Sequence, residues 1–234
     1  MEHRKLGATG LDVSLLGFGG SEIGDPGVSQ ATVETLLNAA LDAGLNVIDT
    51  AECYRESEEK IGKSVAKRRD EFHLFTKCGH TSGLEGEDWD PDMLARSIDR
   101  SLQRLQTDRV ELVQLHTCDE ATLRKGDVID VLIRAREAGK TRFIGYSGDN
   151  ESAAYAVECG AFDTLQTSVS IAEQIGIDTW IKAAAEKGLG IIAKRPIANA
   201  AWKRDLPESD YGYEYKKRLE KLGYKFLETE DDIK

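Results

Sequence analysis

Four side chains that can bind, donate or accept protons stand at or just beyond the ends of three apolar segments. Segment 46–48 ends in Asp49 and is followed five residues later by Tyr54, segment 73–76 ends in Lys77, and segment 112–115 ends in His116. A phenol, an ammonium, a carboxylate and an imidazole are groups that enzymes use for proton transfer. If the three segments are neighbouring parallel strands, their carboxyl ends meet at one edge of the sheet, and we expect one site there.

The elements that would position these groups alternate along the chain. Alternation of strand-like and helix-like segments of this length predicts βαβ units, a parallel sheet and right-handed crossovers. A G-x-G-x-x-G turn is absent, which favours a closed (β/α)8 barrel over an open doubly wound sheet. Strand-like runs lie at 15–20, 46–49, 73–76, 111–115, 142–146, 164–167 and 190–193, and helix-like runs lie at 29–43, 57–67, 92–105, 128–138, 151–159 and 179–187.

The two ends of the chain depart from this alternation. Residues 4–14 alternate around a glycine-containing turn and predict a hairpin. After Pro196 the pattern weakens: 198–210 reads as irregular, 213–222 as a charged helix, and the acidic run 228–234 as frayed. No eighth apolar strand is found. We expect one domain over 1–234, an α/β barrel without a recognisable eighth βα unit.

Composition excludes several classes of protein. A net charge of −11 argues against a nucleic-acid surface, and no run approaches the roughly 20 apolar residues of a membrane span. The four cysteines lack C-x-x-C spacing, so a reducing cytoplasm is the expected location. Their spacing also matches no zinc pattern, and we expect no metal.

The motifs together resemble the aldo-keto reductases. The resemblance rests on Asp49-Thr50-Ala51-x-x-Tyr54, on Ser57-Glu58-Glu59-x-Ile61-Gly62, on the strand-end Lys77 and His116, and on the opening run 6–19. It implies a (β/α)8 barrel that binds NADPH, with NADH not excluded, and reduces a small aldehyde or ketone.

The resemblance also implies roles for the four strand-end residues. Tyr54 would be the general acid. A free tyrosine has a pKa of about 10, and we expect the ammonium of Lys77 to lower the pKa of Tyr54. Asp49 would keep Lys77 charged and in place, and His116 would hydrogen-bond the substrate carbonyl.

Cofactor contacts are implied at the ends of later strands. Ser147 and Gln166 match positions that hold the nicotinamide carboxamide, and Lys194 and Arg195 are candidates for the cofactor phosphates. Two positions depart from the family. Gly148 stands where an asparagine commonly follows the serine, and Val169 stands where an aromatic residue usually stacks on the nicotinamide. The full cofactor set is Gly20, Ser147, Gly148, Gln166, Lys194 and Arg195, in which Gly20 either approaches the cofactor closely or marks a tight strand end.

Family members usually continue for many tens of residues beyond this length. We therefore expect weak cofactor binding, and self-association through open strand edges. Trp89, in the long loop after the third strand, is a candidate wall of the substrate pocket. Cys53, Cys78 and Cys118 lie close to the four site residues, and we expect the charge of Lys77 to lower a thiol pKa there.

Two other functions stay open from sequence alone. One is an aldolase that forms a Schiff base through Lys77 or Lys194. The other is a catalytically idle, redox-sensing or regulatory subunit that retains the barrel.

Overall fold

Seven parallel strands form one curled sheet in the computed structural model, which describes residues 1–203, 205–210 and 212–224. Each strand pairs with its neighbour in sequence, so the sheet order follows the chain from β3 to β9. The predicted architecture is confirmed, and the sheet has no eighth strand within the described residues. The strands are β3 (Phe18–Gly19), β4 (Val47–Asp49), β5 (His73–Cys78), β6 (Val110–His116), β7 (Thr141–Ser147), β8 (Thr164–Ser168) and β9 (Gly190–Lys194).

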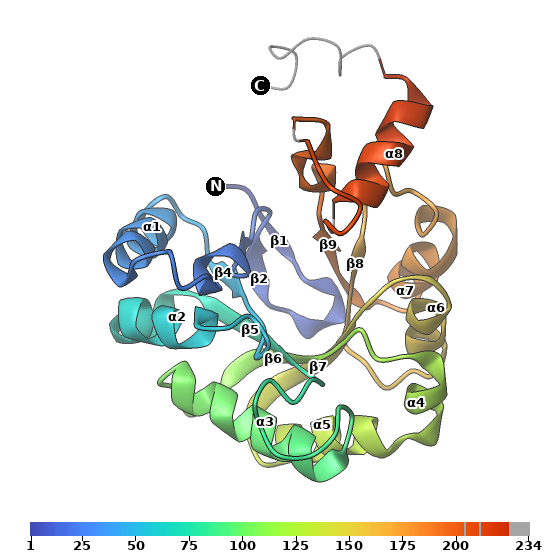
Figure 1. Cartoon of the computed structure of the whole chain (residues 1–234). Helices are drawn as coiled ribbons and strands as arrows, with labels where there is room; N and C mark the ends of the chain where they lie inside the picture. The colour runs from blue at the N-terminus through green and yellow to red at the C-terminus, as the bar shows by residue number, and fades with distance from the viewer. Residues whose placement is uncertain (204, 211, 225–234) are drawn as a thin grey trace.

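The connecting helices lie outside the curl of the sheet, as Figure 1 shows. None of the helices in the described ranges is both long and apolar enough to cross a membrane. The helices are α1 (Gln30–Asp42), α2 (Ser57–Val65), α3 (Pro91–Arg104), α4 (Glu120–Lys125), α5 (Asp127–Glu137), α6 (Asn150–Glu158), α7 (Lys182–Glu186) and α8 (Tyr213–Leu222). Short helical turns are η1 (Gly7–Thr9), η2 (Glu22–Gly24), η3 (Ala66–Glu71), η4 (Ile177–Ile181) and η5 (Ala198–Lys203).

Consecutive strand residues face opposite sides of the sheet, as the two-residue period of a strand requires. Ile48, Leu74 and Val113 belong to the large core between the sheet and the helices. Their neighbours Val47, Phe75 and Leu112 pack inside the curl. Both faces of the sheet are therefore buried, which explains why the strands read as continuous apolar runs.

The predicted hairpin is present and covers the amino ends of the strands. β1 (His3–Lys5) pairs antiparallel with β2 (Asp12–Ser14), and Leu6 and Leu11 pack inside the curl. Gly7 has a φ of +51°, and a Cβ there would collide with the backbone of Gly190. The hairpin therefore lies across the amino ends of the strands, opposite the carboxyl ends that carry Asp49 and His116.

Some local predictions differ from the structure. Lys77 lies within β5 rather than after it, and the predicted helix 179–187 is divided into the π-helical turn η4 and the shorter α7. α4 was not predicted, and η5 forms within a segment expected to be irregular. The acidic run 228–234 lies outside the described residues.

Candidate active site

A buried ion pair lies at the carboxyl end of the sheet. Lys77 Nζ is 2.7 Å from Asp49 Oδ2 and donates a second hydrogen bond to the carbonyl oxygen of Thr50 at 2.7 Å. The Lys77 side chain is 2% exposed and that of Asp49 is 15% exposed. Parallel pairing of β4 with β5 brings the two residues together. A charge-assisted hydrogen bond of this length holds the ammonium in one position.

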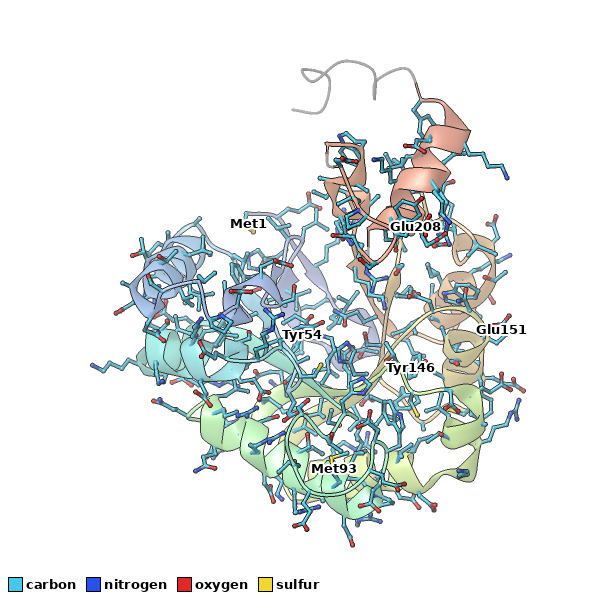
Figure 2. All side chains as sticks on the ribbon, viewed as in Figure 1. Met1, Tyr54, Met93, Tyr146, Glu151 and Glu208 are labelled. Atoms are coloured by element: carbon cyan, nitrogen blue, oxygen red, sulfur yellow. The ribbon has the colours of Figure 1, made fainter. Side chains whose placement is uncertain are left out.

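Tyr54 lies on the turn after β4, close to this ion pair. Lys77 Nζ is 5.3 Å from the centre of the Tyr54 ring. Figure 2 labels Tyr54 near the middle of the molecule. Burial, reinforced by the negative charge of Asp49, raises the pKa of Tyr54 above its usual value. The expectation that Lys77 lowers this pKa is wrong, because desolvation disfavours phenolate and the ammonium is already paired with Asp49. Tyr54 is therefore a neutral phenol that carries its proton.

Glu52 fixes the turn that carries Tyr54. Its backbone N–H donates to the carbonyl oxygen of Lys77 at 3.1 Å, and its buried carboxylate pairs with Arg100 and Arg104 of α3. Sequence reasoning missed this anchor. The available signal was the i, i+4 spacing of the two arginines, which places both on one face of a helix.

His116, the last residue of β6, faces Tyr54. The two ring centres are 5.5 Å apart with an angle of 81° between the ring planes. Burial, with a smaller contribution from the charge of Lys77, lowers the pKa of His116 to about 2. The imidazole is thus neutral and carries one N–H.

Cys53 is the nearest partner of one His116 nitrogen. Cys53 Sγ lies 3.3 Å from His116 Nδ1. A thiol that keeps its proton can donate to Nδ1, because a ring nitrogen accepts a hydrogen bond better than thiol sulfur does. The ring proton is then on Nε2, since the partner of one nitrogen selects the tautomer. Cys53 therefore favours the tautomer that points an N–H away from the thiol.

The three thiols near the site are not activated. Burial raises the pKa of Cys53 and outweighs the opposing charge of Lys77. Burial likewise raises the pKa of Cys78, and raises that of Cys118 to about 12. The expected lowering of a thiol pKa by Lys77 is therefore wrong. All four cysteines are free thiols.

We expect Cys53 to react with iodoacetamide more slowly at pH 7 than free cysteine does, because only the thiolate is nucleophilic. Its rate should rise as the pH is increased beyond 9. Peptide mass spectrometry over a pH series measures both effects, and the same protein in urea supplies the unburied reference. Faster alkylation of Cys53 in the folded protein than in urea would contradict the assigned pKa direction.

Gln166, a predicted cofactor residue, is hydrogen-bonded to Asp49 of the ion pair. Gln166 Nε2 donates to Asp49 Oδ2 at 3.0 Å. Ser147 is directly opposite Gln166 in the pairing of β7 with β8. A hydroxyl and a carboxamide therefore lie side by side near the ion pair, and both suit a nicotinamide carboxamide.

Packing alone accounts for the two glycines of the predicted cofactor set, because neither position has room for a Cβ atom. Gly20 donates its N–H to Asp49 O and accepts from Ser57 Oγ, and a Cβ on Gly20 would lie 2.9 Å from that oxygen. A Cβ on Gly148 would collide with the ring and hydroxyl of Tyr146. This collision explains why no asparagine stands at position 148. Their cofactor contacts remain predictions.

Lys194 is the last residue of β9, Arg195 follows it, and the two cations share one carboxylate. Asp149 Oδ2 is 3.1 Å from Lys194 Nζ and 3.8 Å from the Arg195 guanidinium. Burial opposes the charge of Asp149, but Lys194 and hydrogen bonds from neighbouring groups lower its pKa overall. Burial lowers the pKa of Lys194, and Asp149 only partly offsets this. Any anion bound by the two cations competes with Asp149.

The long loop after β5 completes the mouth of the site. His80 lies 5.7 Å from His116 and 5.5 Å from Trp89, measured between ring centres. Trp89 covers Gly79, where a Cβ would collide with the indole. His80 thus lies between Trp89 and His116 and contacts both rings. Over the described part of the chain, no three His, Cys, Asp or Glu residues are arranged to hold a metal ion.

Comparison with known proteins identifies the family. The model of the aldo/keto reductase family matches residues 15–232. L-galactose dehydrogenase of Arabidopsis thaliana is 32% identical over 216 residues, which cover 85% of this chain and 66% of that protein. The chain therefore spans just under two thirds of that relative's length.

Solved structures show the same relationship. A putative aldo-keto reductase from Pseudomonas aeruginosa superposes with a TM-score of 0.76 at 31% identity, covering 86% of this chain and 82% of that one. An aldo-keto reductase from Bacillus halodurans in its holo form superposes with a TM-score of 0.78 at 27% identity, covering 90% and 72%. Because the family model matches most of this chain, the chain belongs to the aldo/keto reductase family.

Proposed function

We propose that this protein is an oxidoreductase that reduces an aldehyde or ketone to an alcohol with NADPH. The observation that carries the proposal is the Asp49–Lys77 ion pair beside a buried neutral Tyr54, with neutral His116 at 5.5 Å from the phenol ring. These groups can bind a carbonyl oxygen and deliver a proton to it. The family match supports oxidoreductase chemistry.

In this mechanism the carbonyl oxygen accepts hydrogen bonds from the Tyr54 hydroxyl and from His116 Nε2. When bound, the nicotinamide supplies the hydride to the carbonyl carbon. Charge then develops on the oxygen, and the Tyr54 proton moves to it because an alkoxide is a stronger base than a phenolate. Lys77 Nζ lies 5.3 Å from the centre of the Tyr54 ring, and its ammonium only partly offsets the burial and the Asp49 charge that disfavour the phenolate left on Tyr54. In the oxidative direction, the same phenolate would take the proton of an alcohol.

The donors at the ends of β7, β8 and β9 fit a nicotinamide dinucleotide. Ser147 and Gln166 would hold the carboxamide, and Lys194 and Arg195 would bind phosphate oxygens in place of Asp149. No residue on these strand ends separates NADPH from NADH, so the choice of NADPH rests on the family resemblance. We also propose a reducing compartment such as the cytoplasm, where the four free thiols stay reduced.

The two alternatives have less support. Lys77 is held as an ammonium by Asp49, and an ammonium is not a nucleophile. Lys194 is a better Schiff-base candidate because burial lowers its pKa, yet it too is paired with a carboxylate. A catalytically idle subunit would bind the cofactor but would not turn over a carbonyl substrate.

The test is a fluorescence titration with NADPH and with NADH, followed by steady-state assays with small aldehydes. We expect saturable binding, tighter for NADPH, and loss of NADPH absorbance on addition of propionaldehyde. Binding without turnover across a panel of aldehydes and ketones would favour the idle subunit. Trapping of an aldehyde adduct by borohydride in the absence of cofactor would favour the Schiff base.

A further inference from the structure

His80 and Asp88 form a hydrogen-bonded pair in the loop after β5. His80 Nδ1 lies 2.9 Å from Asp88 Oδ2, and Asp88 Oδ1 accepts the backbone N–H of Thr81 at 2.8 Å. The carboxylate is therefore fixed by two hydrogen bonds, one of them from the loop's own backbone. The loop is closed by a bond from Trp89 N to Gly79 O at 3.0 Å, which keeps His80 and Asp88 together.

This pair lies next to the reacting groups. The His80 ring is 5.7 Å from the His116 ring, which is itself 5.5 Å from the Tyr54 ring. The rings of Tyr54, His116 and His80 thus lie in that order at the site. His80 is 34% exposed, in contrast to the buried Lys77, so a ligand can reach it.

We propose that His80, oriented by Asp88, binds a hydroxyl group on the carbon next to the substrate carbonyl. The substrate is then an aldehyde or ketone that carries a hydroxyl group on the adjacent carbon. This inference rests on the proposed carbonyl reduction and specifies its substrate. In this arrangement Tyr54 and His116 would bind the carbonyl oxygen and the adjacent carbon would face His80, whose ring centre is 5.7 Å from that of His116.

The chemistry of the pair favours a hydroxyl over an anion. Asp88 occupies Nδ1, so the free hydrogen-bonding atom of His80 is Nε2. Neutral Nε2 accepts a hydrogen bond from a hydroxyl, and protonated Nε2 donates one to it. A substrate carboxylate can bond only to the protonated ring, and the charge of Asp88 repels it. His80, through its side-chain hydrogen bond, lowers the pKa of Asp88, so that charge persists at neutral pH.

The test compares three aldehydes that differ in the group beside the carbonyl. Glyceraldehyde carries a hydroxyl, propionaldehyde carries none, and glyoxylate carries a carboxylate. We expect His80→Ala to lower kcat/KM for glyceraldehyde by about tenfold, the effect of one lost hydrogen bond. Propionaldehyde should change by less than about twofold. His80→Gln, which keeps a donor and an acceptor, should restore part of the preference.

A second His–Asp pair supplies the matched control. His3 Nδ1 lies 3.2 Å from Asp12 Oδ2 on the hairpin, at the opposite end of the sheet, and His3→Ala should leave all three substrates unchanged. An equal loss for glyceraldehyde and propionaldehyde in His80→Ala would show a structural role and overturn the proposal. A selective loss for glyoxylate would overturn it in favour of an anion subsite.

The experiments distinguish a protein that does not reduce carbonyls from a protein whose His80 does not bind the hydroxyl group. If the unaltered protein reduces none of the three aldehydes, the proposed function fails, and binding can still be followed by NMR of the His80 ring. The subsite predicts that glyceraldehyde shifts the His80 signals and that propionaldehyde does not. Identical spectra with both aldehydes would overturn the hydroxyl site by itself.

Discussion

Replacing Tyr54 with phenylalanine is expected to lower kcat for carbonyl reduction by about 10²- to 10⁴-fold, the contribution of a positioned general acid. The phenylalanine ring keeps the contact with Lys77 and removes only the hydroxyl. Because the phenol is not among the cofactor donors, the dissociation constant for NADPH should change by less than about twofold. Steady-state assays and fluorescence titration measure the two quantities separately.

Tyr155→Phe is the matched control for this substitution. Tyr155 lies on α6, outside the curl of the sheet, where its ring packs under the guanidinium of Arg124. That variant should retain the activity of the unaltered protein. Undiminished turnover in Tyr54→Phe would remove Tyr54 from the mechanism and leave His116 as the remaining proton donor.

Replacing Lys77 with methionine is expected to lower the free energy of unfolding by roughly 3–5 kcal/mol, because it leaves Asp49 buried without its counter-charge. Activity should be lost as well. The double variant Lys77→Met with Asp49→Leu removes both charges and should recover much of the stability while staying inactive. Urea denaturation of the three proteins, followed by circular dichroism, gives the comparison.

An exposed ion pair calibrates this experiment. Lys140 pairs with Asp99 at the surface, with side chains 36% and 57% exposed, and Lys140→Met should cost at most about 1 kcal/mol. A similar small cost for Lys77→Met would mean that the buried pair contributes no more than a surface pair. The role of Asp49 would then be restricted to orienting Lys77 and Gln166.

Much of the architecture could be predicted because each signal is local. The helix-like run 29–43 corresponds to α1, and the side chain of Ser29 caps this helix by accepting the N–H of Thr32. The helix α8 has the predicted bounds. α4 was missed although its signals were present: Asp119 caps it, and Gly126 ends it in the left-handed conformation. A six-residue helix is too short for an apolar period to be recognised.

The proximity of the candidate residues could be predicted from the sequence, but their electrostatics could not. Strand-end position was enough to bring Asp49, Lys77 and His116 together. The pKa of Tyr54 depends on its burial and on its distance from the charges of Asp49 and Lys77. Neither the burial nor the distances can be read from the sequence. The hydrogen bond between Asp49 and Gln166 joins β4 to β8, and only the curl of the sheet brings them within reach.

The hairpin that closes the amino end also bears on how the chain assembles. Each strand of the sheet after β3 pairs with the strand before it, so these contacts can form one after another as the polypeptide emerges from the ribosome. Contacts between the hairpin and the segment just before β9, such as Ala8 N with Gly188 O, join residues that lie far apart in the chain. They carry the greatest loop-closure entropy and should form late. A destabilised hairpin would therefore slow the final folding step more than the early ones.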